Sequence, residues 1–263
     1  MLRKAVCFMA AAMIVIGNVP HVSAQDSLES MVQLSEEFYT LTKTEDWTEA
    51  RNTLWKLTHT FSRHNWKDTD LSVEGLHALS DALIQAKRAL TKANPDGHEI
   101  LMHGIRVRLG FDALENREQP LWHRYYSTLK QDVSQLKDAV PTEDKTEIQQ
   151  SLDRLYAHYH LIQPALYVSR TPEVIERVDA LFTYMGEQIH DVTVNRQQLQ
   201  QAVEQWEKLI PPLFYGTDAE VLAVGQLPEY SIHLTTWLLA VLIGGVLTYV
   251  VWRKAQGEQV IRL

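Results

Sequence analysis

Cysteine is almost absent from this sequence. The 263 residues contain one cysteine, Cys7, and it lies inside the first apolar run. The rest of the chain therefore has no disulfide of its own, no thiolate metal site and no cysteine nucleophile. A domain of about 200 residues can bury a sufficient core without such cross-links. We expect packing alone to hold the domain together.

Two further kinds of pattern are missing. No Gly-x-Ser-x-Gly elbow and no phosphate-binding glycine loop occurs, and the acidic residues are spaced as on solvated helix faces. No stretch alternates apolar and polar residues as a half-buried strand does. The sequence therefore predicts an all-α fold. It indicates no catalytic residue and no cofactor, and we expect a protein that is not an enzyme.

Positive charge is scarce in the long middle part of the chain. The chain has 25 basic and 33 acidic residues, and five of the basic residues but only one acidic residue lie outside residues 26–230. The middle part therefore carries 20 basic against 32 acidic side chains, a net charge of −12. Nucleic acids and anionic lipid surfaces bind to cationic patches. The composition therefore disfavours a nucleic-acid partner.

Long apolar runs are also few, and the first of them opens the chain. Arg3 and Lys4 precede an apolar stretch over residues 5–17, and a small-residue pattern that suits signal peptidase follows at residues 22–24. This order predicts a signal peptide over residues 1–24. An uncleaved anchor is the alternative, but the apolar stretch is short for a full span.

The second apolar run lies near the end of the chain. It carries no charged side chain from Leu234 to Trp252, and a helix of that length matches the thickness of a bilayer, roughly 30 Å. It predicts a transmembrane helix over residues 232–252. Arg253 and Lys254 follow at once and mark the cytoplasmic side, so residues 253–263 would form a short cytoplasmic tail.

Within this predicted span, small residues indicate a helix contact. Ala240 and Gly244 are four residues apart, a spacing that permits two membrane helices to approach closely. Together with the export signal, the span predicts a protein anchored once in the cell membrane, with the middle of the chain outside the cytoplasm.

Helical periodicity runs through the middle of the chain and predicts about eight helices over residues 25–210. Ser72, Thr142 and Asn195 are expected N-caps, and Pro164 is expected to stop or kink the helix that follows Thr142. A pair of prolines beginning at Pro211 is expected to end the last helix and open a linker over residues 211–231. Short turns indicate antiparallel hairpins. The hairpins could pack as a bundle or as a curved stack, and the stack is slightly favoured.

Histidines invite a metal site, but their spacing excludes one. His98 and His103 in HEILMH are five residues apart, which places them about 140° apart on a helix, whereas two zinc ligands on one helix need a spacing of four. His158 and His160 are two residues apart and point in nearly opposed directions. We expect no metal.

Aromatic residues are the remaining candidates for recognition. Tyr125 fits the apolar stripe of the fifth helix, so Trp122 and Tyr126 beside it could contact a partner. Packing against a neighbouring hairpin is the alternative, and it is the commoner role of large aromatic residues in helical domains.

The order of parts, together with the stretch DWTEARNTLWKLTHTF (residues 46–61) and the closing apolar run, resembles the sporulation protein YpjB family of endospore-forming bacilli. The resemblance implies a role in endospore formation, in the mother cell, with the mother-cell or forespore membrane as the expected location and with no established biochemical activity. It transfers no catalytic motif.

These observations support two functional hypotheses. The first is a non-enzymatic, membrane-anchored protein whose exported helical domain binds another protein during sporulation. The alternative is a ligand-sensing ectodomain that signals through a membrane partner. A hydrolase of wall material is the least supported, because no residues for its chemistry are visible.

Overall fold

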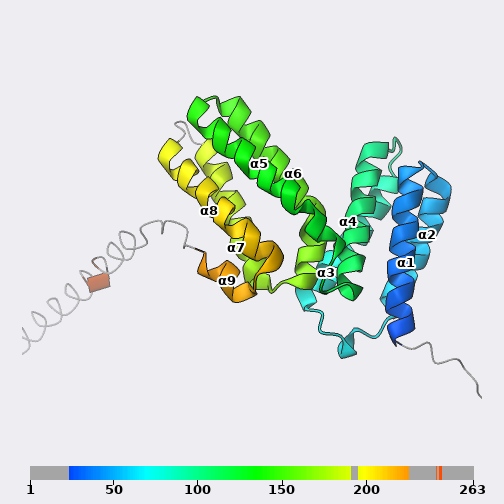
Figure 1. Ribbon diagram of the computed structural model, residues 1–263. Helices are drawn as coiled ribbons and strands as arrows, with labels where there is room; N and C mark the ends of the chain where they lie inside the picture. The colour runs from blue at the N-terminus through cyan, green and yellow to red at the C-terminus, as the bar shows by residue number, and fades with distance from the viewer. Residues whose placement is uncertain (1–23, 191–194, 225–240, 242, 245–263) are drawn as a thin grey trace, which may run out of the picture.

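The computed structural model describes residues 24–190, 195–224, 241 and 243–244 (Figure 1). These residues form nine α-helices and no strand. The α-helices are α1 (Ala24–Lys43), α2 (Trp47–Arg63), α3 (Val73–Leu90), α4 (Gly97–Glu115), α5 (Tyr126–Ala139), α6 (Lys145–Ser169), α7 (Pro172–His190), α8 (Arg196–Tyr215) and α9 (Asp218–Ala223). Three short 3₁₀ helices lie between them: η1 (Trp66–Asp68), η2 (Leu121–Tyr125) and η3 (Val140–Thr142).

The predicted C-terminal transmembrane helix over residues 232–252 is not found. Within the part of the chain that the structure describes, no helix is both long and apolar enough to cross a membrane. The fold class that included such a span is therefore wrong. An uncharged run measures hydropathy, and hydropathy alone does not establish one continuous helix.

Several expectations from the sequence lie outside the described residues. They concern the signal peptide up to residue 23, Ala240 of the predicted helix contact, and the topology anchors Arg253 and Lys254. Gly244, the other half of that contact, is described.

Helices α1 to α4 form a first four-helix bundle. α1 packs against α2 and α4, and α3 packs against α4 and α2, so the four helices close a ring. The apolar stripes predicted from the sequence face inward. The core of this bundle contains, among others, the buried residues Met31, Phe38, Leu54, Leu57, Leu79, Leu83, Ile100, Val107 and Phe111.

Helices α5 to α8 form a second bundle of the same kind. α5 packs against α6 and α8, and α7 packs against the same two helices. Aromatic rings fill its centre: Phe182 lies 4.9 Å from Tyr159 and 4.8 Å from Trp206 between ring centroids. The structure therefore resolves the choice between stack and bundle in favour of two bundles side by side (Figure 1).

The long helix α6 joins the two bundles. Besides its partners in the second bundle, it packs against α3 and α4 (Figure 1). Small residues permit this approach, because a Cβ on Gly75 would lie 2.8 Å from the carbonyl oxygen of Tyr167, and one on Gly110 would lie 3.2 Å from Pro164. Pro164 was expected to stop or kink the helix, but α6 continues to Ser169.

The predicted linker over residues 211–231 is wrong for its first half. α8 continues through Pro211 and Pro212 to Tyr215, and α9 follows with a capping box on Thr217. The reason is burial, since Leu213 and Phe214 are at most 1% exposed in the second core. Their packing outweighs the weak helix propensity of proline.

Arg170 fastens this C-terminal segment to the end of α6. Its guanidinium donates to the carbonyl oxygens of Leu213 at 2.7 Å and Gly216 at 2.8 Å, and to Asp218 at 3.1 Å. This half-buried arginine satisfies carbonyl groups that the end of a helix leaves without a partner.

The N-caps predicted from the sequence are largely confirmed. The Ser72 hydroxyl accepts from the backbone N–H of Gly75 at 3.0 Å, and the side chain of Asn195 accepts from that of Gln198 at 3.2 Å. For α6 the cap is Asp144, which accepts from two backbone N–H groups, and not Thr142 as expected. A carboxylate is a better acceptor than a hydroxyl at this positive helix end.

Candidate functional site

The structure places Trp122, a predicted partner contact, in the core. Its side chain is 1% exposed, its ring lies 4.8 Å from that of Phe214, and its Nε1 donates to Ser169 at 3.3 Å. A partner protein cannot reach this side chain. The expectation of a contact at Trp122 is therefore wrong, and packing explains the residue.

Tyr126, the second predicted contact, is half-buried and lies beside an exposed aromatic residue. Its ring lies 5.5 Å from Phe214 and 5.1 Å from Tyr215, and Tyr215 is 64% exposed. Because the ring of Tyr126 packs mostly against its own chain, a partner contact there stays a prediction.

An apolar groove lies on a different face, between α2 and α3. It has a volume of about 430 Å³, and none of its lining residues is acidic. The lining residues are Thr58, Phe61, Ser62, Trp66, Leu76, Ser80, Leu83, Ile84 and Lys87. We refer to it as the α2–α3 groove.

Local contacts shape one end of the α2–α3 groove. After α2 the chain turns back, and Trp66 lies against Phe61 with ring centroids 4.9 Å apart. Its Nε1 donates to the carbonyl oxygen of Phe61 at 3.1 Å, which fixes the ring. An indole with its N–H satisfied presents an apolar face at little entropic cost.

Large apolar side chains remain exposed along this groove. Ile84 on α3 is 47% exposed. Trp55 on α2 is 67% exposed and shares a helix face with Thr58 and Ser62, because three and four residues separate neighbours on one face. Exposed apolar groups that gather along a groove mark interaction surfaces.

This groove was not predicted from the sequence, although two features of the sequence point to it. Trp66 lies outside any apolar helix pattern, and Ile84 falls beside the buried stripe of α3 rather than on it. A large apolar residue away from the buried stripe is the mark of a second, solvent-facing contact surface.

A polar cavity lies where the two bundles meet, among α3, α4 and α6. Its volume is about 450 Å³. It is lined by Val73, Glu74, His77, Ala78, Asp81, Arg106, Gln163, Pro164 and Tyr167. We refer to it as the junction cavity.

Arg106 of α4 is the unusual residue of the junction cavity. It is 5% exposed, and its Nε has no hydrogen-bond partner in the described part of the chain. Burial lowers the pKa of this guanidinium, while the nearby carboxylate of Asp81 acts to raise it. Sequence periodicity missed Arg106 because it occupies a buried helix position where an apolar residue is expected.

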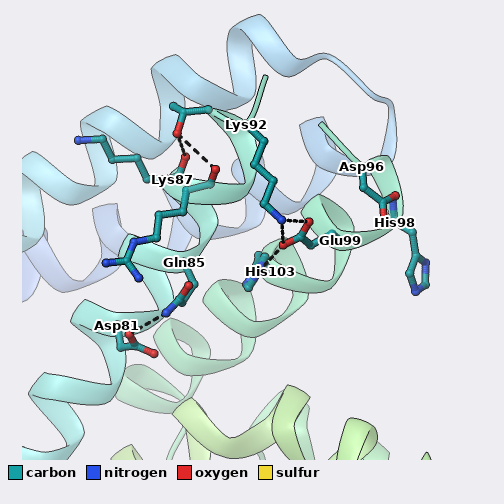
Figure 2. Close-up of polar contacts among 10 residues, drawn as sticks. Asp81, Gln85, Lys87, Lys92, Asp96, His98, Glu99 and His103 are labelled. Carbon is teal, nitrogen blue, oxygen red and sulfur yellow. Dashed lines mark hydrogen bonds and ion pairs between the residues drawn. The ribbon is translucent and has the colours of Figure 1, made fainter. Parts of the chain in front are cut away.

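Figure 2 shows the polar contacts of two acidic residues, Asp81 on α3 and Glu99 on α4. Asp81 accepts from Gln85 at 3.3 Å on α3, and Lys92 donates to both oxygens of Glu99, at 2.7 Å and 2.6 Å. His103 lies 3.9 Å from the same Glu99. These pairs leave the guanidinium of Arg106 without an ion-pair partner among the described residues.

Two histidines near Arg106 have a lowered pKa. Burial lowers the pKa of His103 and that of His160, and the charge of Arg106 lowers both further. Nδ1 of His103 is buried and has no partner in the described residues. An imidazole carries no negative charge, so neither histidine supplies a counter-ion for Arg106.

The histidines of HEILMH lie apart, as their spacing requires. His98 is exposed at the start of α4, whereas His103 is half-buried against Glu99 (Figure 2). Across the described residues, no three His, Cys, Asp or Glu side chains gather as metal ligands would.

These features define an all-α protein of two four-helix bundles, with an open apolar groove and a cavity lined by a buried arginine. The sequence model of the sporulation protein YpjB family matches residues 28–262. The chain therefore belongs to this family. It is also similar to an uncharacterized protein, YpjB, of Bacillus subtilis (strain 168), with 23% identity over 178 residues that cover 67% of each chain. No solved structure matches it.

Proposed function

We propose that this chain acts in endospore formation as a non-catalytic protein that binds a partner protein through the α2–α3 groove. Membership of the sporulation protein family supports the first part. The open groove of about 430 Å³, with Ile84 exposed on its wall, carries the second part. No catalytic step is assigned to the chain.

The chemistry of the groove favours an amphipathic helix as its occupant. Two helices form its walls, and such grooves accept the apolar face of a third helix. Lys87 is its charged lining residue, and Arg51 donates to the carbonyl oxygen of Leu90 near the same end of α3. We expect the partner helix to place an acidic residue next to its apolar stripe, opposite Lys87.

The test is the exchange Ile84→Glu, made in the native host. Because Ile84 is 47% exposed, the variant should fold and melt as the parent does, but a carboxylate in the groove should exclude an apolar helix face. Heat-resistant spore counts should fall toward those of a strain without the gene. The matched control is Leu222→Glu, an exposed leucine of α9 that is 41% exposed, and it should sporulate normally.

A photo-crosslinking residue at position 84 supplies the direct readout. In sporulating cells it should join the chain to a protein that the same residue at position 222 does not reach, and Trp66→Ala should abolish that product. Normal sporulation by Ile84→Glu, or equal crosslinking from both positions, would contradict the proposal.

The position of the helical domain outside the cytoplasm stays a prediction. It rests on the export signal read in residues 1–24. The second hypothesis, ligand sensing, is favoured by a separate observation, the junction cavity.

A further inference from the structure

The starting point is an arginine that its own protein leaves unpaired. Arg106 is 5% exposed, and its Nε lacks a hydrogen-bond partner among the described residues. A buried charge without a counter-ion is costly, and proteins rarely keep one without a use for it. The Nε of Arg170 also lacks a partner among the described residues, but its two terminal nitrogens donate to three acceptors, whereas no acceptor is found for Arg106 there.

Arg106 lines a space large enough for a ligand. The junction cavity of about 450 Å³ falls in the range of small-molecule sites, roughly 300–1,000 Å³. A planar guanidinium at the wall of such a cavity is suited to bidentate binding of a carboxylate.

The cavity has a second, opposite charge on its other wall. Asp81 and Glu74 of α3 line it, and Glu74 is exposed while Asp81 is half-buried. Gln163 and Tyr167 of α6 add polar groups from the second bundle. A simple anion would pair with Arg106 alone, whereas a ligand with separate positive and negative groups would pair with both walls.

We propose that the junction cavity binds a small zwitterion, an amino acid or a short peptide, with its carboxylate on Arg106 and its ammonium group on Asp81 and Glu74. The ligand would also contact α6 and so bridge the two bundles. The inference goes beyond the proposed function and does not depend on it. The cavity and the α2–α3 groove use different faces of α3, since the cavity is lined by Glu74, His77 and Asp81 and the groove by Leu76, Ser80 and Ile84.

The test is isothermal titration of the purified full chain with defined probes. The probes are an equimolar mixture of the protein amino acids, dialanine, acetate, ethylamine and inorganic phosphate. The proposal expects the amino-acid mixture or dialanine to bind with a Kd below about 1 mM, while acetate and ethylamine, which each carry one of the two charges, bind at least about tenfold more weakly.

Two variants locate the binding site. Arg106→Gln and Asp81→Asn should each weaken binding by about tenfold or more, whereas Arg124→Gln and Asp138→Asn, exchanges of exposed residues elsewhere, should not. Thermal melting checks that each variant is folded, and Asp81 is accessible enough to be exchanged without a cavity. Ile84→Glu should bind the ligand as the parent does, which separates this site from the groove.

Three results would overturn the proposal. The first is no binding of the mixture or of dialanine at about tenfold above the expected Kd. The second is binding that Arg106→Gln leaves unchanged. The third is acetate or phosphate binding as tightly as the zwitterions, which would define a plain anion site instead.

Discussion

At the scale of single residues, Arg106 and Arg170 show how two arginines that are largely shielded from water take different roles. Arg170 replaces the water that it loses with two carbonyl oxygens and a carboxylate, so its charge is used in folding. Arg106 is shielded from water in the wall of the junction cavity, and no such acceptors are found for it in the described part of the chain. Burial therefore lowers the pKa of Arg106. The difference between them is a difference in acceptors, not in exposure.

The first prediction at this scale concerns how the half-buried histidines make the free energy of unfolding depend on pH. Burial lowers the pKa below the ordinary 6.5 at His64, His103, His123 and His160. The folded state therefore favours the neutral form, and between the two pKa values the unfolded state binds more protons. The free energy of unfolding should be constant above about pH 7.5 and should fall as the pH decreases from there to about 5.5.

Urea unfolding across this pH range measures the effect. His160→Gln should reduce the loss of stability on acidification, because it removes one of the four groups. The exposed His98, exchanged for glutamine, should leave the slope unchanged. Asp179 acts in the opposite direction, since burial raises the pKa of its carboxyl above 3.8, but its influence lies at lower pH. A stability that rises on acidification would contradict this prediction.

Much at this scale could be predicted from the sequence, and some could not. The caps Ser72 and Asn195 were readable, because a cap depends on its own next three residues. Arg106 and Trp122 were not, because their roles depend on distant elements. Arg106 faces α3 and α6 across the cavity, and Trp122 packs on Phe214, which lies in a segment expected to be a linker.

At the scale of elements, glycines decide how closely helices pack. A Cβ on Gly110 of α4 would lie 2.8 Å from Leu79 and 3.2 Å from Pro164, so this residue sits between α3 and α6. A Cβ on Gly186 of α7 would meet nothing within 4 Å. Both are glycines inside helices, where alanine is intrinsically better by about 1 kcal/mol.

The exchange of each glycine for alanine should therefore have opposite effects. Gly110→Ala should lower the free energy of unfolding by about 1–3 kcal/mol, because the methyl group pushes α6 away from its neighbours. Gly186→Ala should raise it by about 0.5–1 kcal/mol, since only helix propensity changes. Chemical denaturation of the two variants beside the parent measures both, and a stabilising Gly110→Ala would show that α6 can move.

At this scale, helix ends were wrongly predicted at prolines, for a physical reason. Pro211 and Pro212 were expected to end a helix and Pro164 to stop or kink one, but α6 and α8 continue through them. A proline removes one hydrogen bond, at a cost of about 3 kcal/mol. The buried residues that follow, Ala165 and Leu166 in α6 and Leu213 and Phe214 in α8, are at most 1% exposed and offset it. A helix-breaking residue fails to end a helix where buried residues on both sides of it stabilise the helix by tertiary packing.

At the scale of the whole molecule, the apolar stripes predicted the helices but not their arrangement. Eight amphipathic helices fit a stack or a bundle equally, because a stripe shows that a face is buried and not which helix covers it. In the structure α1 meets α4, and α5 meets α8, so that each group of four closes on itself. These contacts join helices far apart in sequence, where no pattern within one helix can report them.

The same arrangement raises the question of whether the bundles unfold separately, which the last prediction addresses. Each has its own core, but Val168 of α6 packs against both, and α6 lies along α3 and α4 as well as α5. Shared burial of this kind couples two cores into one cooperative unit.

Leu57 in the first core and Leu136 in the second, both 0% exposed, allow a matched test. Either leucine exchanged for alanine should cost about 2–5 kcal/mol. If the molecule is one cooperative unit, each variant lowers the hydrogen-exchange protection of the slowest amides in both bundles by the same amount. Two independent bundles would instead show loss confined to the bundle that carries the exchange. We expect the shared loss, because separating the bundles would expose the buried face of α4 and α6 that Gly110 and Pro164 bring together.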